Sequence, residues 1–390
     1  MSSIFKYSLL LLPPWAIYSL FIFAVDNGFI GLLQKTFVEK ALPGTKNAFL
    51  KTSYTGISSL DRALASAVVL FWPACYGSLP SVSLYGLCFA GGMAASWVLV
   101  FLETSRKGTS LQILRMATAF GVLMQTTGFA LVMPIYFALS LSTLPRGVRW
   151  DTICVDLSVL KVLPASMIIG YITPILIMSL PAPSIIEFYF KQQILALWQV
   201  WPLLVSFLVS NLAAIHSKGR PNERFEEAHA TIWYFRRVYA FGFACSAIPH
   251  LVACTLSLTA ALFPTIFSAD IAAELHPLRV FVPVLPWSGE RPSSVAEGTL
   301  WFFHWDYSIG AVAVLLWAVA LHTEGYRRQG IHISYIWLWF KILAGSAVAG
   351  VCGIAVGLIW ERDELVFISV NFQGDSNKKQ SEENFESKVR

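Results

Sequence analysis

The stretch Tyr7–Val25 reads YSLLLLPPWAIYSLFIFAV and carries no charged side chain. An α-helix needs roughly 20 apolar residues to cross the hydrocarbon core of a bilayer, so this stretch is predicted to be a transmembrane helix. It lacks a small-residue cleavage site followed by a soluble domain. We therefore interpret it as a retained span and not as a cleaved signal peptide.

Comparable apolar runs recur along the whole chain. Of the 390 residues, 56% are hydrophobic and 13% are charged, about half the roughly 25% of charged residues usual in soluble domains. The predicted fold class is all-α, a polytopic transmembrane helix bundle with about eight or nine spans. The candidate segments are 7–26, 61–76, 83–103, 112–142, 157–180, 188–215, 233–263, 298–322 and 334–360. The second segment is the weakest because Pro73 interrupts it.

The chain is predicted to form one transmembrane helical domain, residues 1–370, followed by a disordered polar tail, residues 371–390. The net charge of +5 is small and spread among loops, which argues against nucleic-acid binding. The six cysteines form no C-x-x-C pair and are expected to be small buried residues. The basic residues do not fix the orientation in the membrane, and the oligomeric state is left open.

One apolar segment contains an aspartate. Residues Leu300–Gly310 read LWFFHWDYSIG. Asp306 lies inside the predicted helix 298–322, and Phe302 and Phe303 precede it at helical spacing. Removing a carboxyl group from water without a nearby cation favours its protonated form, and a neutral carboxylic acid in an apolar site can donate a proton. Asp306 is therefore a candidate catalytic acid, with helix capping or a hydrogen bond to a neighbouring span as the structural alternative.

Glu103 ends the predicted helix 83–103 and is the second candidate for acid or base chemistry. Placing a carboxyl group at membrane depth costs free energy, so its presence there indicates a partner or a function. The proximity of Arg106 and Lys107 offers another explanation, an ion pair at the membrane interface. Both readings of Glu103 stay open at the level of the sequence.

Three further polar residues are candidates for substrate binding. Gln125 and Gln199 lie on polar stripes of predicted helices and could hold a ring or hydroxyl group, although polar residues often join spans without further function. His304 could orient a water molecule near Asp306 or be an interfacial histidine. His250 follows Pro249 and is expected to bond a backbone carbonyl that the proline frees.

Several motifs are missing from the sequence. There is no P-loop, no H-E-x-x-H and no G-x-S-x-G, and no His, Cys and Asp cluster has metal-ligand spacing. The aspartates are widely separated, whereas enzymes that ionise a prenyl diphosphate hold Mg²⁺ with closely spaced carboxylates. This pattern favours a reaction started by a protein acid. A small-molecule transporter and an intramembrane prenyltransferase remain as alternatives.

The chain resembles the fungal integral-membrane terpene cyclases of the ascofuranone and macrophorin pathways. The resemblance rests on Tyr54–Asp61 leading into Phe71–Leu84, on Trp97–Arg106, and on His304–Gly310. It implies cyclisation of the terpenoid chain of a meroterpenoid in the membrane, begun by protonation of a terminal olefin or epoxide.

The same resemblance implies a prenylated aromatic or quinone-type substrate, and no metal and no other cofactor. We expect an integral membrane protein of the endoplasmic reticulum, surrounded by lipid. Aromatic faces can stabilise a cationic intermediate, which makes Phe302, Phe303, Trp305 and Tyr307 candidates for substrate binding. Because these four surround the helix, we expect Phe302 and Phe303 to share the side of Asp306.

Overall fold

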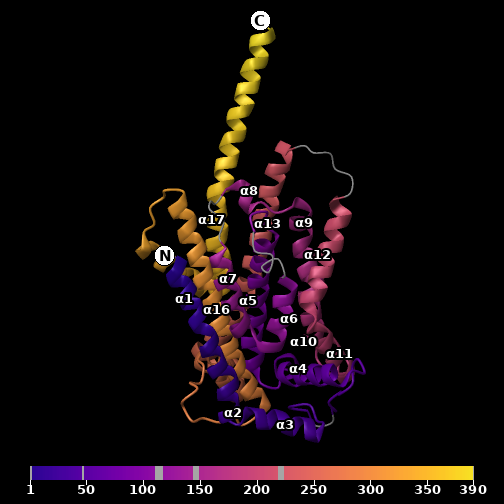
Figure 1. The fold of residues 1–390 in the computed structure, drawn as a ribbon. Helices are drawn as coiled ribbons and strands as arrows, with labels where there is room; N and C mark the ends of the chain where they lie inside the picture. The colour runs from indigo at the N-terminus through magenta and orange to yellow at the C-terminus, as the bar shows by residue number, and fades with distance from the viewer. Residues whose placement is uncertain (1, 46–47, 110–116, 144–148, 218–223, 390) are drawn as a thin grey trace.

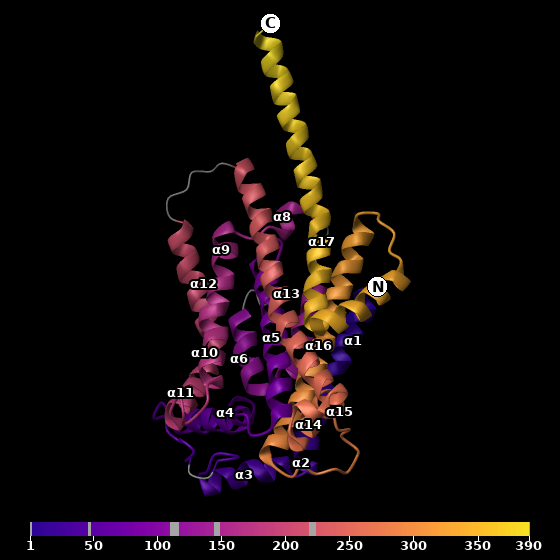
Figure 2. The same ribbon diagram turned by 180° about the vertical axis from the view of Figure 1, so that it is seen from behind.

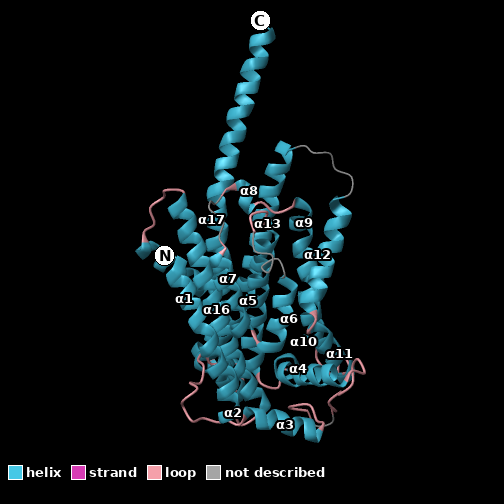
Figure 3. Cartoon of the chain, in the orientation of Figure 1, coloured by secondary structure: helices cyan, strands magenta, loops and turns pink. Residues whose placement is uncertain are grey.

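The structure is a computed structural model that describes residues 2–45, 48–109, 117–143, 149–217 and 224–389. Within these ranges the chain forms helices and no strand, apart from one isolated bridge between Ala41 and Phe49 (Figure 3). The predicted all-α class is confirmed for the described part of the chain.

Within the described residues, two helical runs, 2–26 and 157–179, each contain one π-helical turn. The α-helices of the first half are α1 Ser2–Ala16, α2 Phe23–Asp26, α3 Phe29–Glu39, α4 Ser58–Tyr76, α5 Pro80–Ser105, α6 Ala117–Thr127, α7 Phe129–Ser142 and α8 Trp150–Ile153. Those of the second half are α9 Leu157–Met167, α10 Thr173–Ser179, α11 Phe188–Trp198, α12 Trp201–Ser217, α13 Arg224–Leu262, α14 Ala269–Leu275, α15 Pro277–Phe281, α16 Val295–Arg328 and α17 Tyr335–Val389. The shorter elements are η1 Ile17–Ile22, η3 Ile168–Ile172 and η4 Pro264–Ile266.

By length and composition, six helices of the described chain are able to cross a membrane, or seven if the bent pair α11 and α12 forms one span. The six are Ser3–Asp26, Pro80–Ser105, Leu157–Ser179, Ala228–Leu262, Val295–Arg328 and Tyr335–Ile368. The larger count of eight or nine is not confirmed, because α4 fails this test and α7 is too short. The division into a domain 1–370 and a disordered tail stays a prediction.

The predicted single helix 112–142 is broken, and residues 112–116 lie outside the described part of the chain. Its remainder is α6 and α7, which are separated at Gly128 (φ 97°, ψ 154°). A side chain is strained at this positive φ, so glycine suits the position. Segment 188–215 is likewise two helices, bent by 65° between Trp198 and Trp201. Hydrophobicity placed the apolar runs correctly but did not reveal these breaks.

Helix α5 is the centre of the bundle, with 83% of its candidate span buried, more than in any other candidate span (Figure 1). Small residues let neighbouring helices approach it closely. A Cβ added to Gly91 would lie 2.4 Å from the carbonyl oxygen of Cys245 on α13. Helices α3 and α4 lie at the end of the bundle opposite the C-terminus, as both views show (Figures 1 and 2).

Asp61 in α4 orders the loop that precedes this helix. Its carboxylate accepts hydrogen bonds from the N–H groups of Tyr54 (3.0 Å), Thr55 (2.7 Å) and Gly56 (3.2 Å), and from the Thr55 hydroxyl (2.9 Å). These bonds, led by the one from the Thr55 N–H, lower the pKa of Asp61 to about 2. The loop before α4 is therefore held by an ionised side chain.

We expect Asp61→Ala to speed hydrogen exchange at the amides of Thr55 and Gly56, while exchange in the core of α5 stays unchanged. The lowered pKa gives the pH dependence its sign. The stability that the ionised Asp61 gives to this loop is complete above the unfolded-state pKa of about 4 and is lost as the pH falls through about 2. Exchange mass spectrometry on the detergent-solubilised protein measures both effects. Unchanged exchange at these two amides in the variant would contradict the role of Asp61.

Candidate active site

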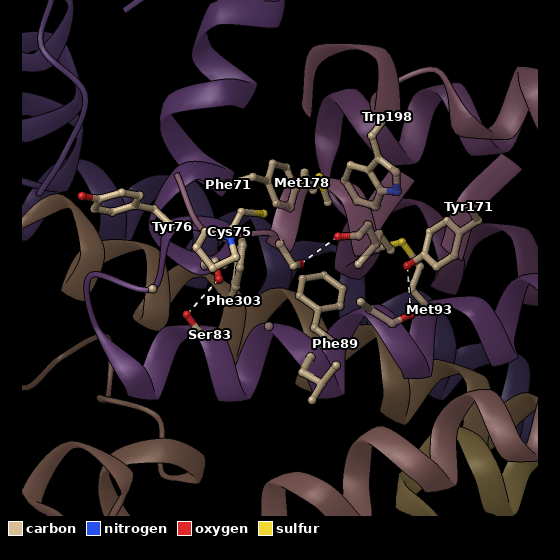
Figure 4. A pocket seen from close by; sticks show the side chains of 18 residues that line it. Phe71, Cys75, Tyr76, Ser83, Phe89, Met93, Tyr171, Met178, Trp198 and Phe303 are labelled. Atoms are coloured by element: carbon tan, nitrogen blue, oxygen red, sulfur yellow. Dashed lines mark hydrogen bonds between the residues drawn. The ribbon is translucent and has the colours of Figure 1, made fainter. Parts of the chain in front are cut away.

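An apolar cavity of about 430 Å³ lies between α4, α5, η3, α10, α11 and α16 (Figure 4). We call it the aromatic cavity. Its aromatic lining residues are Phe71, Tyr76, Phe89, Tyr171, Trp198 and Phe303. Among the described residues, no aspartate, glutamate, lysine, arginine or histidine lines it. Its size lies within the range of small-molecule sites.

The aromatic rings form a continuous wall. The ring centroids of Phe71 and Phe303 are 5.4 Å apart, and Phe89 meets Phe303 edge to face at the same distance. On the other side of Phe71, Trp198 makes an edge contact at 5.4 Å and in turn lies 5.8 Å from Tyr171. Such packing fixes the rings and presents π-electron density to whatever occupies the cavity.

Three hydroxyl groups that line the cavity donate hydrogen bonds to backbone carbonyl groups. Ser83 donates to the carbonyl of Ala74 (2.8 Å), Ser179 to that of Ile175 (2.7 Å) and Tyr171 to that of Ala90 (2.9 Å), as the dashed lines of Figure 4 show. Each hydroxyl oxygen keeps lone pairs for accepting a hydrogen bond. The cavity therefore offers the electron-rich ends of its dipoles and rings, a setting that suits positive charge.

The cavity has an open end where α4 and α10 end. Gly77, Ser179 and Pro181 are exposed lining residues at the open end, whereas Met93 and Trp198 are buried. Leu87 on α5 is a further exposed lining residue. An apolar molecule can enter at the open end without crossing the centre of the bundle.

A buried lysine ties the two helix ends together at the mouth of the aromatic cavity. The Nζ atom of Lys191 donates to the carbonyl oxygens of Cys75 (2.7 Å) and Leu180 (2.9 Å). A cation is stabilised at helix C-termini by the partial negative charge of the last carbonyls. Lys191 was not among the predicted functional residues, because its partner Cys75 is 116 positions away and the local sequence does not show this contact.

Asp306 lies beside the aromatic cavity and does not line it. The Oδ1 atom accepts a hydrogen bond from the N–H of Ala130 (2.8 Å), in the first turn of α7. A Cβ on Gly128 would lie 2.9 Å from the same oxygen. The geometry is that of a helix N-cap supplied by another helix, which is the structural alternative that the sequence left open.

One layer of aromatic rings separates Asp306 from the aromatic cavity. Phe89 lines the cavity and contacts Phe129 at a centroid distance of 6.1 Å. Phe129 directly precedes Ala130, whose N–H bonds Asp306. On α16, Phe303 lines the cavity one turn before Asp306. The carboxyl group thus lies behind the Phe89 and Phe303 side of the wall.

Asp306 differs from the other buried carboxylates in its partners. In the described part of the chain the buried carboxylates are those of Asp61, Asp306, Glu324 and Asp363. Glu324 and Asp363 each form ion pairs with two arginines. Asp61 holds the loop before α4. Asp306 is the one near the aromatic cavity, and among the described residues its carboxyl group forms no ion pair.

The aromatic neighbours of Asp306 point in different directions. Phe303 lines the aromatic cavity, whereas Phe302 packs against the small cluster around Leu20 of η1 and Ile309. The indole of Trp305 donates to the carbonyl of Val284 (2.9 Å). Of the two phenylalanines expected on the side of Asp306, only Phe303 reaches the cavity.

Tyr307 and His304 lie behind the wall, around Tyr85. Tyr307 packs on Phe89 with ring centroids 5.3 Å apart. The Nε2 atom of His304 is 2.8 Å from the carbonyl oxygen of Val280, and its ring lies 4.4 Å from that of Tyr85. Neither residue lines the aromatic cavity.

The two glutamines also lie outside the aromatic cavity. Gln199 occupies the bend between α11 and α12, where its Nε2 donates to the carbonyl of Leu195 (3.4 Å). Gln125 is half-buried on α6. Their roles in substrate binding stay predictions.

Glu103 belongs to a buried charge network at the far end of α5. Its Oε1 atom lies 2.8 Å from Nε of Arg106 and 3.0 Å from Nη2 of Arg362. Arg106 in turn pairs with Asp363 (2.7 Å), which also accepts a hydrogen bond from Tyr239 (2.6 Å). The network joins α5, α13 and α17. Glu103 lies ten positions beyond Met93, about 15 Å along the helix, so Glu103 and Asp306 are not brought together in one site.

No group of three or more His, Cys, Asp or Glu side chains is placed to hold a metal ion within the described ranges. The residues missed by the sequence analysis are those that build the cavity: Phe71, Phe89, Tyr171 and Trp198. Phe71 and Ser83 fall inside the stretch Phe71–Leu84 that carries the resemblance, which was the only available signal for this region.

These features define an all-helical protein, in the described part of the chain, with six helices long and apolar enough to cross a membrane and an aromatic cavity between its helices. The chain belongs to the CtvD domain family, whose model matches residues 5–367. It is 37% identical to "Terpene cyclase verU1" of Penicillium polonicum, covering 89% of this chain and 91% of the relative. It is 31% identical to "Terpene cyclase penA" of Penicillium crustosum, covering 92% and 96%, and 31% identical to "Terpene cyclase atmA" of Aspergillus flavus, covering 93% and 98%. The resemblance to fungal terpene cyclases is confirmed, and no solved structure matches the chain.

Proposed function

We propose that this protein is a membrane-bound terpene cyclase that closes rings in the prenyl chain of a meroterpenoid inside the aromatic cavity. The single observation that carries the proposal is that cavity itself, electron-rich and without a charged lining residue in the described chain. Membership of a family whose curated members are named terpene cyclases supports the same class of enzyme.

The proposed reaction is a rearrangement of bonds with no leaving diphosphate. A proton adds to the terminal olefin, or to the oxygen of a terminal epoxide, whose C–O bond then breaks. The resulting carbocation accepts the electron pair of an internal double bond, which forms the ring C–C bond. Loss of a proton from the final cation restores neutrality, so the product has the mass of the substrate.

The aromatic lining supports the cationic steps. A cation over an aromatic face gains about 0.5 to 2 kcal/mol, more where water is absent. Phe71, Phe89 and Phe303 surround one region of the cavity. The ring centroid of Phe303 lies 5.4 Å from that of Phe71 and 5.4 Å from that of Phe89. Excluding water from this region also protects the cation from premature capture.

We assign the initiating acid to Asp306. A general acid must come within hydrogen-bond reach of the atom that it protonates. Phe89 stands between the cavity and the Phe129 turn that Asp306 caps, so the proposal requires the Phe89 ring to move when the substrate binds. Glu103 as the acceptor of the final proton stays a sequence prediction, and its two arginine partners support a structural role for it.

The proposal includes the location in the endoplasmic reticulum membrane, with the prenyl chain entering from lipid near Ser179 and Pro181. The higher count of eight or nine spans requires α4 and the broken α6 and α7 unit to cross as well. The apolar composition and the six long apolar helices support a membrane location.

Feeding acyclic prenylated phenols or quinones, and their epoxides, to microsomes that contain the protein tests this function. We expect a cyclic product of identical mass in the presence of EDTA. Strict dependence on Mg²⁺ with release of pyrophosphate would establish a prenyltransferase instead. Movement of an unchanged compound across sealed vesicles would establish a transporter.

Filling the aromatic cavity should slow turnover strongly. We expect Ala90→Phe, on the cavity wall, to lower the rate about 100-fold, because small displacements of reacting groups have effects of this size. The matched control is Leu176→Phe on α10, where the side chain is 63% exposed on the outer surface. Product formation by both variants is compared at equal amounts of folded protein. Equal rates would place the reaction elsewhere.

A further inference from the structure

Helix α17 reverses direction within its apolar half. The Nζ atom of Lys341 lies 2.7 Å and 2.8 Å from the two carboxylate oxygens of Glu361. In a straight α-helix, 20 residues separate two positions by roughly 30 Å, far beyond the reach of both side chains. The segment Tyr335–Ile368, apolar and long enough for one span, therefore does not cross as one straight helix.

Backbone geometry places the turn at Gly350. This residue has φ 72° and ψ 166°, a conformation open essentially only to glycine. On either side of it, a Cβ added to Gly345 would lie 3.2 Å from the Cβ of Ile354. Residue 345 contacts residue 354, and residue 341 contacts residue 361. Such a pattern indicates two antiparallel arms that meet near residue 350.

The carbonyl groups released by the turn have partners on α13. Ser246 donates from Oγ to the carbonyl of Ala349 (2.7 Å), and Nε2 of His250 lies 3.1 Å from the carbonyl oxygen of Ala347. Backbone groups at membrane depth need such partners, because lipid supplies none. His250 thus bonds the carbonyl of Ala347 on α17 and not one that Pro249 frees on its own helix, so the predicted partner was wrong.

The first arm, residues 335–349, has one face on the bundle and one face outward. Leu338, Ile342 and Ala349 are buried, whereas Ile336 is 86% and Leu343 is 67% exposed. At 1.5 Å per residue the arm is about 22 Å long, shorter than the roughly 30 Å hydrocarbon core. It can enter a bilayer but cannot cross it.

Aromatic and basic residues mark where the arm begins. Tyr335, Trp337 and Trp339 are exposed at its start, just after Arg327 and Arg328 at the end of α16. Tyr and Trp at the level of the lipid headgroups, with basic residues beside them, are typical of a membrane interface. The loop after α16 and the C-terminal end of α17 lie at the same end of the bundle (Figure 1).

We infer that residues 335–349 form a re-entrant helix whose exposed face contacts lipid acyl chains, so that the loop 329–334 and the C-terminal end of α17 lie on one side of the membrane. This inference concerns topology and lipid contact and does not depend on the proposed reaction.

Epitope tags read the topology directly. One tag is inserted at Gly330, one is added after Arg390, and a control tag is inserted at Gly289, before α16. In sealed microsomes we expect protease to reach the first two tags from the same side and the control tag from the opposite side. Access to the tags at Gly330 and after Arg390 from opposite sides would overturn the inference.

A cross-link tests the reversal independently of the tags. The pair Gly345→Cys and Ile354→Cys brings two Cβ atoms near the 3.5 to 4.5 Å that a disulfide requires. We expect mass spectrometry of the oxidised protein to find the linked peptides at high yield, with none in either single variant. A straight helix would hold the two positions about 13 Å apart, and absence of the link in folded protein would contradict the turn.

Photo-cross-linking identifies the occupant of the outer face. With benzoylphenylalanine at Leu343, we expect adducts in which one protein chain carries a lipid molecule that is cross-linked through its acyl chain. A cross-linked dimer in place of lipid adducts would show that a second copy covers this face and would overturn the lipid assignment.

Discussion

Asp306→Asn is expected to lower the rate of cyclisation at least about 100-fold without loss of the fold. General acid catalysis contributes typically 10²- to 10⁴-fold, and an asparagine has no acidic proton to give. The amide oxygen of asparagine can still accept the N–H of Ala130, as Oδ1 of Asp306 does at 2.8 Å. The substitution therefore removes the acid and keeps the cap of α7.

This design separates the two roles that the structure gives to Asp306. Asp306→Ala removes both the acid and the cap, and should lower activity and the thermal unfolding midpoint together. Asp306→Asn should lower activity alone, measured as product formed per folded protein in microsomes. Full turnover by the asparagine variant, with the alanine variant unstable, would show that Asp306 is only a cap.

Breaking the buried charge network should have the largest effect on stability. We expect Asp363→Asn to lower the free energy of unfolding by about 3 to 5 kcal/mol, because it leaves the two buried arginines with Glu103 as their one shared carboxylate, so that one buried positive charge is uncompensated. Asp363 is fully buried and lies 2.7 Å from both Arg106 and Arg362. The amide replaces the carboxylate with little change of shape, so the loss reports the charge.

The neighbouring residue provides the control. Glu364 pairs with Arg236 at 2.7 Å, but both side chains are partly exposed, and such pairs contribute about 0 to 1 kcal/mol. Thermal unfolding in detergent, followed by tryptophan fluorescence, should show a large shift of the midpoint for Asp363→Asn and a small one for Glu364→Gln. Equal shifts would mean that the network does not hold α5, α13 and α17 together.

The sequence predicted the apolar segments because crossing a bilayer requires a length of apolar residues that is visible locally. It predicted α5, α13 and α16 as continuous helices. It did not show the reversal at Gly350 or the break at Gly128, because a glycine within an apolar run looks the same whether the helix continues or turns. The carbonyl partners on α13 that permit the reversal come from another part of the chain.

The candidate site was predicted only in part for a similar reason. Phe303 was selected because it precedes Asp306 on one helix, and it does line the aromatic cavity. Phe71, Phe89 and Trp198 come from three other helices, and nothing in their local sequence shows that their rings meet. Glu103 illustrates the converse, since its partner Arg362 is 259 positions away in the sequence.

Cyclisation in deuterated water most directly tests the claim that a proton starts the reaction and that no diphosphate leaves. The substrate accepted in the feeding experiment is incubated with EDTA and the membrane-bound protein. A product started at an olefin should gain one non-exchangeable deuterium, and one started at an epoxide should keep the epoxide oxygen as a hydroxyl group at unchanged mass. Ring formation that requires Mg²⁺ and releases pyrophosphate, or an olefin-derived ring without deuterium, would contradict the account.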